Sequence, residues 1–195
     1  MRRAAERAQR VVRNLIDVAH IDGGRLSVER GSHDVSELVA RSVRGFEAWA
    51  RERSVDVVEE TAPGLLATCD PQRIADVLDR LVRAAIDVTP PNGAVRLRAE
   101  RIGTVIRVSV TDGGPTIDES VISCVFDATW QKKIEGTARE RVGLALYVTK
   151  GIVEAQGGTV SAASDARGAT ISFTLPESGV KREPKRAIPL PRPSQ

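Results

Sequence analysis

The sequence predicts an α+β fold, a two-layer sandwich in which helices cover a mixed sheet and an amphipathic helix precedes the whole. Three observations lead to this prediction. Residues 71–88 repeat apolar side chains with helical periodicity, between an Asp-Pro start and a Pro-Pro-Asn-Gly break. Residues 94–111 alternate apolar and polar side chains in two runs, as an antiparallel hairpin does. A third apolar segment, 142–156, ends on a Gly-Gly pair and leads into a second hairpin at 159–175, and this element order is typical of an α+β sandwich.

The N-terminal segment, residues 1–24, has the pattern of an amphipathic helix. Apolar residues recur at spacings of three and four with arginines on the other faces, and Gly23-Gly24 ends the pattern. The apolar stripe consists of Ala4, Ala8, Val11, Leu15 and Val18. Two interpretations are open: a surface helix that packs on its own domain, or one half of a helical dimerisation hairpin. The regular stripe favours the second, which predicts a homodimer or heterodimer formed through this helix.

Helices and short strands follow along the chain. A helix is expected to start near Asp34 or Ser36, and Ser36 has the chemistry of an N-cap. Its apolar face is formed by Val39, Val43, Phe46 and Ala50. Two short strands are expected at 55–59 and 65–69, separated by an Ala-Pro-Gly turn. His33, just before the helix, is expected to lie in a turn.

Irregular segments surround the last helix and end the chain. Residues 113–141 are expected to form a loop with one short helix near 119–124. Residues 177–195 are basic and rich in proline, without an apolar pattern, and are predicted to be a disordered tail. A folded domain is therefore predicted over residues 25–176.

Composition limits the classes of function. Hydrophobic residues make up 41% of the 195, enough for a core, but aromatic residues only 3%, so Val, Leu, Ile and Ala must fill it. The net charge of +3 comes from the two ends: residues 1–20 and 177–195 each carry five Lys or Arg against two acidic residues. The body between them is mildly acidic, so no nucleic-acid surface is expected on it.

Cysteine usage and hydropathy suggest the compartment. The two cysteines, Cys69 and Cys124, make neither a disulfide framework nor a zinc-binding spacing. No apolar run approaches the ~18 residues of a membrane helix, and Met1 is followed by arginines rather than by a signal peptide. The sequence predicts a cytoplasmic protein, or the cytoplasmic part of a longer one.

Three landmarks resemble a known family. A strand ends on Asp112-Gly113-Gly114, a helix begins on Gly143-Leu144, and that helix closes on Gly157-Gly158. In this order they resemble the ATP-binding domain of sensor histidine kinases. These kinases are a branch of the Bergerat-type (GHKL) ATPase superfamily, with DNA gyrase, a heat-shock chaperone and a mismatch-repair ATPase. The resemblance implies that residues 25–176 are the ATP-binding domain and that residues 1–24 are the second helix of a dimerisation hairpin.

The first helix of that hairpin has no counterpart in this sequence. In the family it carries the phosphoacceptor histidine within a His-Glu-Leu-Arg-x-Pro pattern. The two histidines present, His20 and His33, do not continue such a pattern and are interpreted as ordinary surface side chains. No residue is therefore predicted to be catalytic.

The resemblance implies that the adenine end of a nucleotide site is retained. Asp112 matches the carboxylate that accepts a hydrogen bond from the adenine amino group, and Gly114 matches the glycine that lets the backbone approach the base. Gly143 and Leu144 match the end of the phosphate loop, and Thr170 matches a threonine near the nucleotide. These five are the predicted nucleotide-binding residues. Taken alone, the Asp-Gly-Gly segment also fits a plain turn after a strand.

The same resemblance reveals substitutions at the metal end. Residues 80–87 read Arg-Leu-Val-Arg-Ala-Ala-Ile-Asp, where the family has Asn-Leu-x-x-Asn-Ala-x-Lys. Ala84 therefore stands where an asparagine coordinates Mg²⁺, and a methyl group offers no ligand to a hard cation. Arg80 replaces the first asparagine, and Asp87 replaces a lysine that faces phosphate, which turns attraction into repulsion. We expect no metal site and weak ATP binding at most.

The phosphate loop is changed as well. Residues 139–144 read Arg-Glu-Arg-Val-Gly-Leu, where the family has Gly-x-Gly-x-Gly-Leu. Glycines in such a loop let N–H groups approach phosphates closely, and only the last one remains.

Together these losses predict a degenerate module of two-component signalling. Its kinase activity is expected to be impaired or absent, and it would act by binding a response regulator or a partner histidine kinase. Two alternatives stay open. One is a functioning ATP-dependent histidine kinase whose acceptor helix lies outside this chain, and the other is a histidine phosphotransfer protein.

Overall fold

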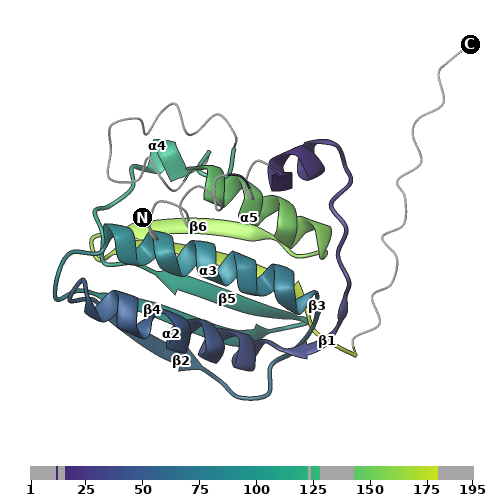
Figure 1. Ribbon diagram of the computed structural model, residues 1–195, viewed down its shortest axis with the longest axis horizontal. Coiled ribbons are helices and arrows are strands. Elements are labelled where there is room, and N and C mark those ends of the chain that lie inside the picture. The colour runs from purple at the N-terminus through teal and green to yellow at the C-terminus, as the bar shows by residue number, and fades with distance from the viewer. Residues whose placement is uncertain (1–11, 13–15, 123, 128–142, 180–195) are drawn as a thin grey trace, which may run out of the picture.

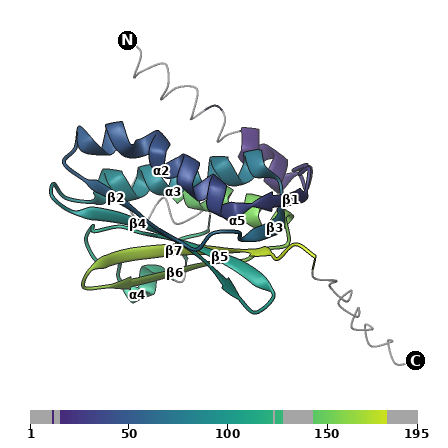
Figure 2. The same cartoon turned by 90° about the horizontal axis from the view of Figure 1, so that it is seen from below.

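The chain folds into two layers, one of helices and one of strands. The computed structural model describes residues 12, 16–122, 124–127 and 143–179. Helices α2 (Val35–Arg51), α3 (Pro71–Val88) and α5 (Gly143–Ala155) lie side by side over one face of a five-stranded sheet (Figures 1 and 2). The predicted two-layer α+β sandwich is confirmed.

The five-stranded sheet is mixed. Its strands stand in the spatial order β2 (Asp56–Thr61), β4 (Ala94–Ile102), β5 (Val105–Thr111), β7 (Gly168–Pro176) and β6 (Val160–Asp165). The β2–β4 pair is parallel and the other three pairs are antiparallel. Both hairpins expected from the alternating sequence, β4–β5 and β6–β7, are present.

The two faces of the sheet differ in chemistry because successive side chains of a strand point in opposite directions. Side chains toward the helices are apolar and buried, among them Leu97, Val108 and Phe173. On the opposite face, hydroxyl groups pair across the strands: Ser109 with Ser172 and Thr111 with Thr170, each at 2.9 Å between oxygens. The core therefore lies between the helices and one face of the sheet.

Helix α3 is the central helix, between α2 and α5. Its bounds agree with the predicted helix 71–88, because the sequence marks both ends. Asp70 is the N-cap, and its carboxylate accepts hydrogen bonds from the N–H groups of Gln72 and Arg73 at 3.0 and 3.1 Å. Pro71 follows at the first helical position, where its missing N–H costs nothing.

A small second sheet corrects one sequence-based expectation. His33 lies in strand β1 (Gly31–Asp34), not in a turn, and β1 pairs antiparallel with β3 (Leu66–Cys69). The pairing brings together segments more than thirty residues apart, and β1 itself has no alternating apolar pattern.

The start of α2 corrects another expectation. Its N-cap is Asp34 and not Ser36, because the carboxylate of Asp34 accepts a hydrogen bond from the N–H of Ser36.

The remaining segments agree with the expected loops in part. The short helix α4 covers Glu119–Ile122 within the predicted loop. Glu177 and Ser178, at the start of the predicted tail, donate backbone hydrogen bonds to the carbonyl groups of Thr104 and Leu66. Residues 180–195 of that tail lie outside the described residues.

Candidate nucleotide site

The predicted site falls along the neighbouring helices α3 and α5. The two helices run antiparallel, because the end of α5 meets the start of α3: the side-chain oxygen of Gln156 accepts a hydrogen bond from the N–H of Asp70 at 2.6 Å. Gln156 is fully buried. The start of α5, at Gly143, is therefore directed toward the second half of α3. Leu144 is the second residue of α5, and residues 139–142 lie outside the described part of the chain.

Asp112 is a buried carboxylate near the end of α3. It follows the last residue of β5, is 6% exposed, and its Oδ1 accepts hydrogen bonds from the N–H groups of Gly114 and Ala169 at 2.8 and 3.2 Å. A carboxylate that accepts two N–H bonds is fixed in direction. The predicted pair Asp112 and Gly114 therefore lies in one structural unit, to which β7 contributes Ala169.

Close packing around Asp112 depends on glycine. Gly168 has a φ of 137°, and a Cβ there would overlap the carbonyl oxygen of Asp112. A Cβ on Gly114 would lie 2.9 Å from the carbonyl oxygen of Val88 at the end of α3. The end of α3, the loop after β5 and the start of β7 thus meet through their backbones.

Thr89 joins this end of α3 to the Asp112 loop. Its hydroxyl donates to the carbonyl of Ala85 at 2.7 Å and accepts from the N–H of Gly113 at 3.1 Å. Thr89 was not singled out from the sequence as part of the site. A threonine directly after a helix and before Pro-Pro was the available signal, since such a hydroxyl can bond back to the helix.

Thr170 does not join the group around Asp112. Its hydroxyl pairs with that of Thr111 on the face of the sheet away from the helices. The neighbouring Ala169 faces the core instead and supplies the N–H that reaches Asp112. Of the five predicted residues, the structure brings Asp112 and Gly114 together, sets Gly143 and Leu144 at the start of α5, and directs Thr170 elsewhere.

Among the described residues, the face of α3 where the family resemblance places a metal carries side chains that fit Mg²⁺ poorly. Arg73, Arg80, Ala84 and Asp87 are spaced by seven, four and three residues, so they share one face of α3. Ala84 is partly buried against the core. Within the described residues, no three His, Cys, Asp or Glu side chains gather as metal ligands. The Mg²⁺ that the family resemblance implies does not fit this face, because residue 84 offers a methyl group.

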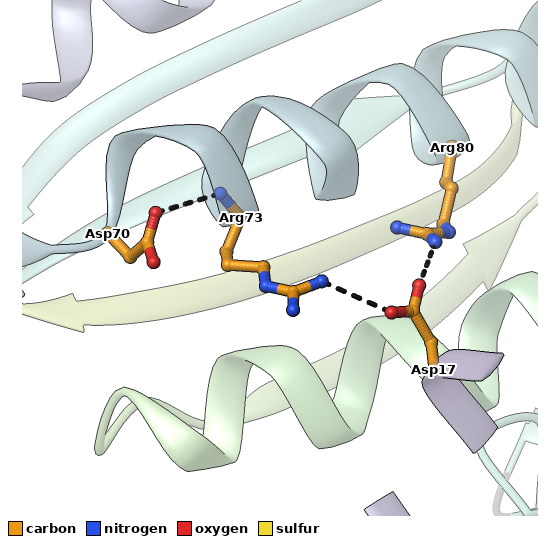
Figure 3. A network of polar contacts seen from close by, with 4 residues as sticks. All are labelled: Asp17, Asp70, Arg73 and Arg80. Carbon is orange, nitrogen blue, oxygen red and sulfur yellow. Dashed lines mark hydrogen bonds and ion pairs between the residues drawn. The ribbon is translucent and has the colours of Figure 1, made fainter. Parts of the chain in front are cut away.

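A carboxylate from the N-terminal segment binds on this face of α3 (Figure 3). Asp17 Oδ1 lies 3.1 Å from Arg73 Nη1, and Asp17 Oδ2 lies 2.5 Å from Arg80 Nη2. The side chains of Asp17 and Arg80 are only 4% and 8% exposed, and that of Arg73 is 27% exposed. We call these three residues the Asp17 triad. Sequence reasoning counted Asp17 only as a charge and missed the triad.

The rest of the N-terminal helix packs on α5. Residues 16–22 are helical, and Ile21 lies so close to Gly151 that a Cβ there would be 2.5 Å from its Cδ1. The hydroxyl of Tyr147 donates to the carboxylate of Asp22, and this hydrogen bond, with a smaller effect of burial, raises the pKa of Tyr147. Val18 of the predicted stripe packs against the core, and the other four stripe residues lie outside the described residues.

Comparison with known proteins places the chain in a family. It matches the family described as histidine kinase-, DNA gyrase B- and HSP90-like ATPase over residues 69–179, more than half of its length. The chain belongs to this family. The match includes α3, the Asp112 loop and α5, and it confirms the resemblance to the ATPase domain of sensor histidine kinases.

One sensor protein and one histidine kinase illustrate the similarity in sequence and in structure. The sensor protein DivL of Caulobacter vibrioides is 31% identical over 183 residues, which cover 91% of this chain and 23% of DivL. The catalytic domain of the histidine kinase ThkA has a TM-score of 0.68 at 30% identity, over 76% of this chain and 96% of that domain. ThkA in complex with the response regulator protein TrrA has a TM-score of 0.65 at 25% identity, over 90% of this chain and 50% of that one. The chain thus spans about a quarter of DivL.

No helix among the described residues is long and apolar enough to cross a membrane.

Proposed function

We propose that this chain is a two-component signalling module whose histidine-kinase ATPase fold has lost metal-dependent ATP chemistry. It acts in the cytoplasm by binding a partner protein, a response regulator or a second histidine kinase. Similarity to ThkA, which was crystallised with the response regulator TrrA, supports this class of partner. Dimerisation through the N-terminal helix, with itself or with the partner, is part of the proposal.

The proposal depends on the residues of α3 at the position where the family resemblance places the metal. Residue 84 has no oxygen to offer, and Arg80, at the position of the family's first asparagine, is engaged by the carboxylate of Asp17. Asp112 and the glycines around it are retained, so we expect the base to bind weakly. We expect Mg²⁺ not to increase the affinity for ATP.

Titration calorimetry with ATP, with Mg²⁺ or with EDTA, tests this proposal. We expect the dissociation constant not to fall when Mg²⁺ is added. Ala84→Asn is the matched variant, and we expect it to remain metal-independent because Arg80 and Asp87 still flank the position. A micromolar dissociation constant that weakens about tenfold in EDTA, or about 1.4 kcal/mol, would contradict the proposal.

The main alternative is a functioning histidine kinase whose acceptor helix lies outside this chain, and the ordered surroundings of Asp112 favour it. Incubation with Mg-ATP and a separately supplied acceptor hairpin separates the two functions. We expect no acid-labile phosphate on the hairpin or on His20 and His33. Phosphate on the hairpin would establish the kinase.

A further inference from the structure

Two arginines of α3, Arg73 and Arg80, bind one carboxylate together, and we call this pair the arginine clamp. Arg73 and Arg80 are seven residues apart, which is two helical turns, so both guanidinium groups reach the same point from one face of the helix. The point they share is the carboxylate of Asp17, bound through one oxygen each (Figure 3). A buried carboxylate needs such partners, because burial of an unpaired charge is strongly unfavourable.

The position of the arginine clamp along α3 can be compared with the positions that bind a nucleotide in the family. Arg80 is one turn, or about 6 Å, from Ala84, the position at which the family binds Mg²⁺. It is eight residues, or about 12 Å, from Val88, which contacts the Gly114 loop beside Asp112. That separation suits the reach of a nucleotide from its base to its terminal phosphates.

We propose that Arg73 and Arg80 form a binding site for the polyphosphate of a metal-free nucleotide, and that this polyphosphate competes with Asp17 for the site. The inference rests on the proposed function, since it takes the missing metal as its starting point. Two guanidinium groups carry the charge of one Mg²⁺, and arginine binds phosphate oxygens in pairs of parallel hydrogen bonds. In this proposal the positive charges of the two arginine side chains take the role that Mg²⁺ has in the family.

Competition with Asp17 links ligand binding to the N-terminal helix. When a polyphosphate replaces the carboxylate of Asp17, both arginines still have an anionic partner. Asp17 loses its partners, and it can become solvated only if the N-terminal helix moves away from α3. The packing of Ile21 on Gly151 and the bond from Tyr147 to Asp22 hold the helix on the domain in the absence of ligand. Polyphosphate binding and helix docking therefore oppose each other, and each weakens the other by the same factor.

Calorimetry with inorganic tripolyphosphate in EDTA tests the clamp. We expect Asp17→Asn to bind tripolyphosphate at least tenfold more tightly than the wild type, because the competing charge is gone. Arg80→Gln should bind at least tenfold more weakly. Arg98→Gln is the matched control, an exposed arginine on β4 that pairs with Glu100, and should leave binding unchanged. Equal affinity of the wild type and Asp17→Asn would overturn the inference.

Different ligands separate a nucleotide site from a simple phosphate site. ATP in EDTA should bind more tightly than tripolyphosphate if the base also reaches Asp112, and adenosine alone should bind most weakly. Equal affinities for ATP and tripolyphosphate would overturn the nucleotide assignment. Arg73→Gln, at a more exposed member of the clamp, repeats the test in case Arg80→Gln fails to fold, and it should also weaken tripolyphosphate binding.

Hydrogen exchange provides a readout that does not depend on affinity. Amides of residues 16–22 should exchange faster when tripolyphosphate is added to the wild type, since the helix loses its anchor. Protection that stays the same at saturating tripolyphosphate would overturn the competition. The proposed function fails on a different result, a gain in ATP affinity with Mg²⁺, so the two failures are distinguishable.

Discussion

At the scale of single residues, the glycine at position 168 limits what the candidate site tolerates. Gly168→Ala would place a methyl group against the carbonyl of Asp112 and force alanine to a φ of 137°. Overpacking costs about 1–3 kcal/mol and the unfavourable φ about 1–2 kcal/mol, so we expect a loss of roughly 3 kcal/mol in the free energy of unfolding. Chemical denaturation measures this loss.

Gly64→Ala is the control for the backbone effect alone. Gly64 has a φ of 74°, and a Cβ there would meet nothing within 4 Å. We expect it to cost only about 1 kcal/mol. Equal losses for the two variants would show that the contact with Asp112 is not tight.

Residues of the site were predictable to different degrees. Asp112 and Gly114 are adjacent in sequence, and a strand that ends in Asp-Gly-Gly marked them directly. Asp17 could not be found in this way, because its arginine partners are 56 and 63 residues further along the chain. Thr170 was assigned by motif, but the motif does not state which face of β7 the side chain occupies, and a single step along a strand reverses the face.

At the scale of elements, the start of α3 depends on one ionised carboxylate. Burial opposes ionisation of Asp70, but hydrogen bonds from the N–H groups of Glu29, Arg73 and Gln72 outweigh it, so the pKa of Asp70 lies below its ordinary value. A lowered pKa in the folded state means that ionised Asp70 stabilises the fold at pH values above its unfolded pKa of about 3.9. This contribution is lost as the pH falls through the folded pKa.

Asp70→Asn tests this contribution because asparagine also caps helices but carries no charge. We expect the variant to be less stable than the wild type at pH 7. The difference should shrink as the pH is lowered from about 4, because the wild type then becomes neutral at this position too. Denaturation at a series of pH values measures it. A difference that is constant with pH would assign the effect of Asp70 to geometry rather than to charge.

Elements that depend on local sequence signals were predicted well, whereas elements that depend on contacts between distant segments were not. Helix α3 was predicted to its bounds because its cap, its first proline and its Pro-Pro break are local signals. Strand β1 was missed because its hydrogen bonds come from β3, and its own four residues, Gly-Ser-His-Asp, favour turns. Strand β2, predicted at 55–59, covers Asp56–Thr61, a small shift that its exposed edge position explains, since few of its side chains are buried.

At the scale of the whole molecule, the N-terminal helix has two faces with different partners. Val18 and Ile21 pack against the core of the domain, whereas Val12 and Ile16 are 56% and 51% exposed. Val18, the one described residue of the predicted stripe, therefore lies on the face that packs on the domain. The exposed Val12 and Ile16 lie outside that stripe, and we propose that they form the face that meets a second chain.

Association through this exposed face is the prediction for the molecule as a whole. Burial of a valine or isoleucine side chain contributes roughly 1.5–3 kcal/mol, so pairing of two such helices is favourable, and we expect a dimer in light scattering at high protein concentration. Ile16→Glu should shift the molecule to a monomer, because a carboxylate would be buried without a partner. Val58→Glu is the matched control, an exposed apolar side chain on the edge strand β2, and should remain a dimer. A wild type that stays monomeric would contradict self-association. A dimer that persists in Ile16→Glu would show that the interface lies elsewhere. Dissociation in Val58→Glu alone would place the interface at the sheet edge.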